Sequence, residues 1–64
     1  MDYERAIQVV QQHEFVNEQT IQRRLAIPYR AAKEITEKLA ENGMLGEPVG
    51  DKGYRLVLTQ NGRG

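Results

Sequence analysis

The chain has no cysteine and no tryptophan, and it has a single histidine. Without thiols it can form neither a disulfide nor a thiolate metal site. No apolar run approaches the roughly 20 residues that a membrane-spanning helix needs. The opening Met1-Asp2-Tyr3-Glu4 is acidic and polar, unlike a signal peptide. We therefore expect a cytoplasmic protein with no membrane contact.

Catalytic signatures are missing as well. There is no Ser-His-Asp set, phosphate-binding loop or dinucleotide fingerprint. His13 has no cysteine or paired carboxylates at ligand spacing, so no metal site is expected. A chain of 64 residues buries about 60% of its unfolded surface, which leaves little room for a pocket beside the core. We expect a single domain over residues 1–58 that is no enzyme and needs no cofactor. Residues 59–64 contain no apolar side chain and are expected to form a flexible tail.

The net charge is zero, but the charges are unevenly distributed. Residues 1–19 contain one basic and four acidic side chains, whereas residues 20–38 contain five basic and two acidic ones. A basic middle segment of this kind can attract nucleic acid. An ordinary mixed surface is the alternative.

Hydrophobic periodicity predicts a first helix that Asp2 caps and that ends near Gln12 or His13. Its apolar stripe has i, i+3, i+4 and i+7 spacing and comprises Tyr3, Ala6, Ile7 and Val10. A short connection follows, in which Phe15 and Val16 are expected to enter the core.

Two further helices are predicted around a tight turn. Asn17 is a good cap for the second helix, whose Ile21 and Leu25 are spaced i, i+4 and point inward. Ala26-Ile27 forms the turn, and Pro28 suits the first position of a third helix. That helix runs to about Asn42 before the terminating Gly43, with a buried stripe of Ala32, Ile35 and Leu39.

A hairpin is predicted to close the fold. Its candidate strands are Met44-Leu45 and Tyr54-Arg55-Leu56-Val57-Leu58, joined by the turn sequence Gly50-Asp51-Lys52-Gly53. The order of elements predicts a small α+β domain, a three-helix winged helix-turn-helix with a C-terminal β-hairpin wing. The expected core comprises Ala6, Ile7, Val10, Ile21, Leu25, Ala32, Ile35, Leu39 and Leu56.

Basic residues lie on both sides of the predicted turn. The N-terminal residues of the second helix of a helix-turn-helix meet base edges in the major groove. Arg30 lies there and can bond guanine bidentately. Tyr29 is suited to a phosphate or a thymine methyl. Arg23 and Arg24, which precede the turn, are placed for phosphates. Solubilising charges on a helical hairpin are the alternative interpretation.

Glu34 and the cations of the predicted wing each have more than one interpretation. Glu34 can accept a hydrogen bond from cytosine, orient Arg30, or pair with a lysine such as Lys33 or Lys38. Lys52 is expected to contact the DNA backbone from a wing tip, with or without Arg55. A plain surface hairpin is the alternative there, because Asp51 weakens a basic wing.

The stretch from Ile21 to Tyr29 resembles the C-terminal gamma domain of the bacterial DNA translocases FtsK and SpoIIIE. The residues that carry the resemblance are Tyr3, Ala6, Gln22, Arg23, Arg24, Ile27, Tyr29, Ala32, Gly43-Met44-Leu45-Gly46 and Arg55-Leu56-Val57-Leu58. The likeness is ungapped over most of residues 3–46. It implies a small winged helix that reads guanine-rich orienting sequences during chromosome segregation and contacts the tyrosine recombinase XerD.

This chain departs from the family at the base-reading positions. It has Arg30 and Ala31 where the family has asparagine and arginine, Glu34 where a further arginine lies, and Pro28 in place of glycine. We therefore expect sequence-preferring binding of double-stranded DNA with modest specificity, and the resemblance supports the fold more than the family's target sequence. The expected contact residues are Gln22, Arg23, Arg24, Tyr29, Arg30, Lys33, Glu34 and Lys52. A module that binds a recombinase or another protein, with little DNA binding of its own, is the alternative.

Overall fold

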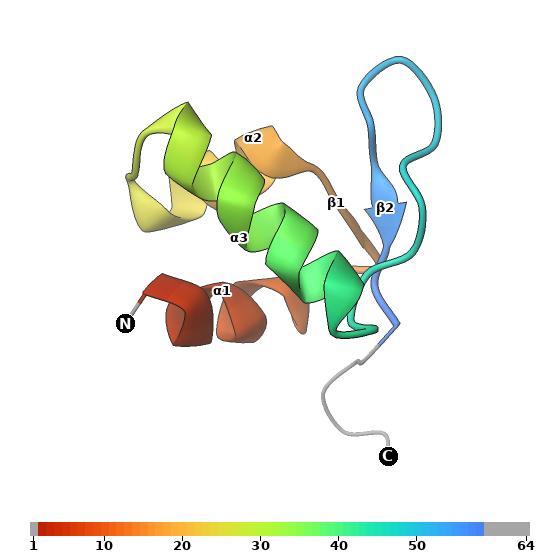
Figure 1. Cartoon of the computed structure of the whole chain (residues 1–64), viewed down its shortest axis with the longest axis horizontal. Coiled ribbons are helices and arrows are strands. Elements are labelled where there is room, and N and C mark those ends of the chain that lie inside the picture. Colours follow the sequence, from red (N-terminus) through yellow and green to blue (C-terminus); the bar gives the residue numbers. More distant parts are fainter. Residues whose placement is uncertain (1, 59–64) are drawn as a thin grey trace.

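The computed structural model describes residues 2–58. Three helices pack together and a short antiparallel sheet lies at one end of them (Figure 1). The elements in order are α1 (Asp2–Val10), β1 (Phe15–Val16), α2 (Glu18–Leu25), α3 (Tyr29–Glu41) and β2 (Arg55–Leu56). This arrangement confirms the predicted α+β winged-helix class. The tail predicted over residues 59–64 lies outside the described residues.

Helix α1 is shorter than its periodicity predicts. Its last turn tightens after Val10, because the N–H groups of Gln12 and His13 donate to carbonyls only three residues back, each at 3.0 Å. Asp2 lies within the first turn instead of ahead of it, and its carboxylate accepts from Arg5 at 3.4 Å. The inward stripe is confirmed in Ala6 and Val10, which are fully buried.

The cap of α2 and the turn after it follow the prediction. The Asn17 side chain accepts from the backbone N–H of Thr20 at 3.0 Å. At the other end, Ala26 adopts a left-handed conformation with φ 56°, and its N–H donates to the Gln22 carbonyl. The N–H of Ile27 donates to the same carbonyl at 3.2 Å. This closed turn holds the start of α3 against α2.

Helix α3 begins one residue later than predicted, because Pro28 has an extended ψ of 153° and acts as the cap. Its buried residues are Ala32, Thr36 and Leu39. Thr36 was not predicted in the core. It is tolerated there because its hydroxyl donates to the Ala32 carbonyl at 2.7 Å.

Gly43 ends α3, as predicted. It has φ +80°, a conformation that a glycine adopts without strain. Its N–H donates to the Ala40 carbonyl at 3.0 Å, and the N–H of Met44 donates to the Leu39 carbonyl at 2.9 Å. These two bonds make a Schellman motif, which satisfies the last carbonyls of the helix and turns the chain toward the sheet.

The sheet differs from a simple hairpin. The main partner of β2 is β1, with Phe15 opposite Leu56 and Val16 opposite Arg55. The predicted first strand of the hairpin contributes only the single bridges Leu45↔Val57 and Val49↔Tyr54. Pro48 lies between these bridges and has no N–H to donate, which limits continuous pairing there.

The predictions that Phe15 and Leu56 enter the core are wrong. Side chains alternate along a strand, and these two residues are directly opposed, so they share a face. That face is turned outward, with Phe15 52% and Leu56 45% exposed. Val16 and Val57 occupy the inner face instead. The core thus comprises Ala6, Val9, Val10, Val16, Ile21, Leu25, Ala32, Leu39, Leu45 and Val57, with Ile7 and Ile35 packed partly buried against it.

Replacing each of two leucines with alanine tests the assignment of this core. Leu39→Ala should lower the free energy of unfolding by about 2–5 kcal/mol, because it leaves a cavity among buried neighbours. Leu56→Ala should cost about 1 kcal/mol or less, since it loses mainly a cross-strand contact. Urea denaturation of both variants measures the difference. Equal losses would mean that the two faces of β2 are assigned wrongly.

Candidate nucleic-acid interface

After Tyr29, the exposed side chains of α3 are all charged. The outward face of the helix lies opposite the buried Ala32, Thr36 and Leu39 and carries the exposed side chains of Arg30, Lys33, Glu34, Glu37, Lys38 and Glu41. The cations Arg30 and Lys33 lie toward the N-terminal end, where the helix dipole is positive as well. Acidic side chains predominate toward the C-terminal end. The face therefore offers an anionic ligand its most favourable contacts at the start of α3.

The cations at the start of α3 have no ion-pair partner among residues 2–58. The single ion pair in that range joins Arg5 and Asp2 on α1, with 3.4 Å between nitrogen and oxygen. Glu34 therefore forms no ion pair with Lys33 or Lys38, which was one of the open alternatives. Arg30 and Lys33 are exposed, and neither side chain forms a hydrogen bond or an ion pair with another of the described residues.

The two arginines before the turn have different environments. Arg24 reaches back to the end of α1, where its guanidinium donates to Gln12 Oε1 at 3.2 Å. It also lies 3.3 Å from His13 Nε2, which can accept when the ring proton is on Nδ1. Arg23 is exposed and makes no hydrogen bond within the described part of the chain. Arg23 is therefore the freer of the two to meet a phosphate.

Gln22 plays a structural part at this turn. Its side chain is half-buried, and its backbone carbonyl is the one that receives the N–H groups of Ala26 and Ile27. The contacts of Arg24 with His13 and Gln12 could not be predicted from the sequence, because the paired residues are 11 and 12 positions apart. Such contacts depend on how α1 and α2 pack.

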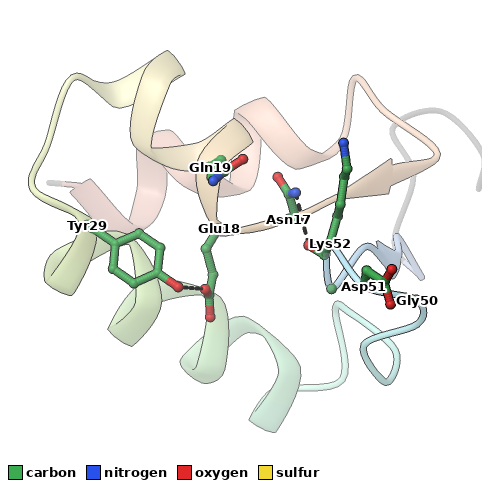
Figure 2. Close-up of a pocket in the computed structure, with 8 residues that line it drawn as sticks. Asn17, Glu18, Gln19, Tyr29, Gly50, Asp51 and Lys52 are labelled. Carbon is green, nitrogen blue, oxygen red and sulfur yellow. Dashed lines mark hydrogen bonds between the residues drawn. The ribbon is translucent and has the colours of Figure 1, made fainter.

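Tyr29 is held by a residue that sequence reasoning missed. Its phenol donates a hydrogen bond to the Glu18 carboxylate from the first turn of α2 (Figure 2). That hydrogen bond raises the pKa of Tyr29 above its ordinary value, with smaller contributions from desolvation and from the Glu18 charge. The hydroxyl predicted to touch a phosphate is therefore already engaged, whereas the ring remains half exposed.

The predicted wing turn is present over residues 50–53. Val49 N–H donates to the Tyr54 carbonyl at 2.8 Å, and Gly53 N–H donates to the Gly50 carbonyl at 3.2 Å. Lys52 is exposed at this turn. Arg55, the other candidate wing cation, instead donates to the Gly46 carbonyl at 3.0 Å and is half-buried.

A groove of 490 Å³ separates the wing turn from the start of α2 and from Tyr29. Figure 2 shows Glu18 and Tyr29 at one end of it and Lys52 at the other. Its lining residues are Asn17, Glu18, Gln19, Tyr29, Gly50, Asp51, Lys52 and Gly53. The lining carries charges of both signs, so it is no phosphate pocket by itself. It lies between the wing turn on one side and Tyr29 with the start of α2 on the other.

The outward face of the sheet forms a second distinctive surface. Phe15 lies opposite Leu56 and Val49 lies opposite Tyr54, so all four side chains share one face. They are all exposed, and so is Leu58 two residues after Leu56. We call these five residues the outer sheet face. The two-residue alternation of Tyr54, Leu56 and Leu58 in the sequence was the signal that could have identified it.

Among residues 2–58, no helix has the length and apolar character needed to cross a membrane. The same range contains no cluster of His, Asp and Glu side chains suited to a metal ion. These findings leave two candidate surfaces within the described part of the chain, the charged face of α3 with its wing and the outer sheet face.

Comparison with known proteins identifies one family. The family model described as the Ftsk gamma domain matches residues 2–60, a span that includes every helix and strand described above. No curated protein and no solved structure matched the chain.

The Tyr29–Glu18 bond makes a pH-dependent prediction. Because the folded-state pKa of Tyr29 is raised, the bond should stabilise the fold fully below the unfolded-state pKa and lose this effect as pH rises through the folded value. Glu18→Ala should return the pKa of Tyr29 toward its ordinary range. A phenolate absorbance titration, taken as the difference from Tyr29→Phe, measures it. Glu14→Ala removes a carboxylate elsewhere and serves as the control. A Tyr29 pKa unchanged by Glu18→Ala would contradict the contact.

Proposed function

The chain belongs to the FtsK gamma domain family, and on this premise we propose that it binds duplex DNA with a sequence preference of its own. Members of that family are small domains for DNA binding and interaction, and they are not themselves catalytic. The role that the resemblance implies is the reading of a sequence that orients a DNA translocase. No cofactor is required for this function.

The observation that carries the proposal is the unpartnered basic start of α3. Arg30 and Lys33 are exposed on a helix that is fixed from behind by Ala32, Thr36 and Leu39. Because neither cation is committed to an ion pair in the described chain, no internal interaction is lost when they meet DNA. A helix that is packed on the core and exposes cations at its N-terminal end is suited to reading bases in the major groove.

The proposed roles within α3 follow from side-chain chemistry. Arg30 reads a base edge, with guanine as its best partner. Glu34 follows Arg30 by one turn and either orients it or accepts from cytosine N4. Lys33 contributes a positive charge beside them. Tyr29 presents its ring to a thymine methyl, since its hydroxyl is bonded to Glu18.

The proposed phosphate contacts surround α3. Arg23 and Lys52 extend into solvent from α2 and from the wing turn. Arg24 reaches a phosphate from a position fixed by Gln12, and Gln22 contributes from the same helix. Contacts of this kind fix the orientation of the domain and add affinity without sequence preference.

A salt titration of DNA binding tests the phosphate contacts. The logarithm of the association constant should fall linearly with the logarithm of the salt concentration. Arg23→Ala should weaken binding to all duplexes alike and reduce that slope by roughly one unit. Arg5→Ala removes the same charge from α1 and is expected to leave the slope unchanged. If Arg5→Ala reduces the salt slope as much as Arg23→Ala does, only the net charge matters. If neither variant reduces the slope, Arg23 touches no phosphate.

Competition between preferred and scrambled duplexes tests the reading residue. Arg30→Ala should cost about 1–3 kcal/mol on the best site and much less on scrambled DNA, relaxing the choice at one base position. Asparagine at position 30 with arginine at 31 and 34 should move the preference toward the guanine-rich family site. An equal loss on both duplexes would reduce Arg30 to a phosphate contact. No loss on either would remove α3 as the reading helix.

The outer sheet face favours a second candidate function, the binding of a protein partner. DNA offers no broad apolar surface to match Phe15, Leu56 and their neighbours, and contiguous exposed apolar patches often mark protein contacts. The partner that the family resemblance implies is a tyrosine recombinase of the XerD type. The two functions use different surfaces, so one chain can carry both.

Separate variants distinguish the two functions. The double variant Phe15→Ser and Leu56→Ser should lose binding to a purified XerD-type recombinase and keep DNA binding, because its changes lie on the outer sheet face. Arg30→Ala should weaken DNA binding and keep binding to the recombinase. Calorimetry with the recombinase and fluorescence anisotropy with DNA measure the pair. Recombinase binding that survives the double variant would exclude this face as the contact.

A further inference from the structure

Asn17 uses both ends of its side-chain amide. Its Oδ1 accepts from the backbone N–H and from the hydroxyl of Thr20, each at 3.0 Å. Its Nδ2 donates to the backbone carbonyl of Lys52 at 3.1 Å, across 35 residues of sequence (Figure 2). The side chain is only 5% exposed. One buried amide therefore joins the start of α2 to the wing turn.

We propose that Asn17 is a positioning residue for DNA binding, which holds the wing so that Lys52 meets a phosphate while α3 lies in the major groove. This inference rests on the proposed DNA-binding function and adds a specific role to it. Both ends of the bridge lie beside the groove between α2 and the wing. The bridge therefore holds the backbone of Lys52, from which its side chain extends, beside the start of α2.

The wing has few other attachments. It projects beyond the helices as a loop ahead of β2 (Figure 1). Val49 at its base is 69% exposed, and Asp51 and Lys52 at its tip are exposed, so no apolar side chain of the turn anchors it in the core. Gly50 and Gly53, which flank the tip, have positive φ values of 79° and 68°. A turn so weakly packed depends on polar contacts such as the Asn17 bridge for its position.

The residue type at position 17 supports this role. Serine, threonine, aspartate and asparagine all cap helices well, because each offers an oxygen to the first-turn N–H groups. Serine and threonine donate and accept through one hydroxyl oxygen, and aspartate only accepts, whereas asparagine has a separate amide nitrogen that can donate to a more distant carbonyl while its oxygen accepts. Capping alone therefore does not require asparagine here, whereas the bridge to Lys52 does.

Two substitutions separate the bridge from the cap. Asn17→Ser keeps a neutral capping oxygen and is too short to reach the Lys52 carbonyl. Asn17→Asp keeps the cap and replaces the donor with an acceptor, which repels that carbonyl. Since aspartate also adds a negative charge, Gln19→Glu in the exposed first turn of α2 is its charge-matched control. Circular dichroism and thermal melts establish that each variant is folded at the temperature of the binding assay.

A double-mutant cycle with Lys52→Ala measures the coupling on duplex DNA. In the parent, Lys52→Ala should weaken binding on the order of fivefold and lower the salt slope by about one unit. In the Asn17→Ser and Asn17→Asp backgrounds, the same change should have almost no further effect, because Lys52 is already displaced. A cap that merely stabilised the fold would leave the effect of Lys52→Ala intact.

The outcomes distinguish this inference from the proposed function. An equal effect of Lys52→Ala in all backgrounds, or no effect in the parent, overturns the role of Asn17 while DNA binding stands. A parent that binds no duplex at low salt overturns both. If the effect of Lys52→Ala disappears in the two Asn17 variants and keeps its full size in Gln19→Glu, Asn17 is coupled to Lys52 and the bridge is the element that positions the wing.

Discussion

The burial of one side of α3 is the interaction on which the rest of this structure depends. Ala32 and Leu39 belong to one core with buried residues of α1 and α2, Thr36 is fully buried beside them on α3, and the turn at Ala26 connects α2 to α3. Opposite sides of a helix point in opposite directions, so burial of one side of α3 determines which of its residues are exposed on the other. The charged face proposed to read DNA is thus a direct consequence of the core.

The electrostatics of the interface are local. The chain has no net charge, and acidic side chains share α3 with the basic ones. The proposed attraction to DNA therefore rests on particular cations that form no ion pair within residues 2–58, above all Arg30, Lys33 and Arg23. Arg55 is engaged by the Gly46 carbonyl, whereas Arg24 is held by Gln12 at the position from which it is proposed to reach a phosphate. Counting the charges in the sequence does not show which cations are engaged within the protein.

Local signals in the sequence predicted much of the fold. Asn17 and Gly43 marked helix ends because caps depend on residues close by. The sheet was harder, because β1 has two residues, too few to show alternation. On β2, Leu56 belongs to a longer apolar alternation than Val57, yet pairing with β1 turned Val57 inward.

The candidate site could be predicted only in part, because some of its contacts join residues that are far apart in the sequence. The face of α3 follows from helical spacing, so Arg30 was placed correctly on the exposed side. The partners of Tyr29 and Arg24 are 11 or more residues away along the chain, and only tertiary packing brings them together.

The central claim is that the exposed face of α3 contacts DNA, and backbone amide chemical-shift mapping with a guanine-rich duplex tests it most directly. We predict perturbations concentrated over residues 29–37, with further ones at Arg23 and Lys52. Perturbations confined to the outer sheet face, or none at low salt, would contradict it.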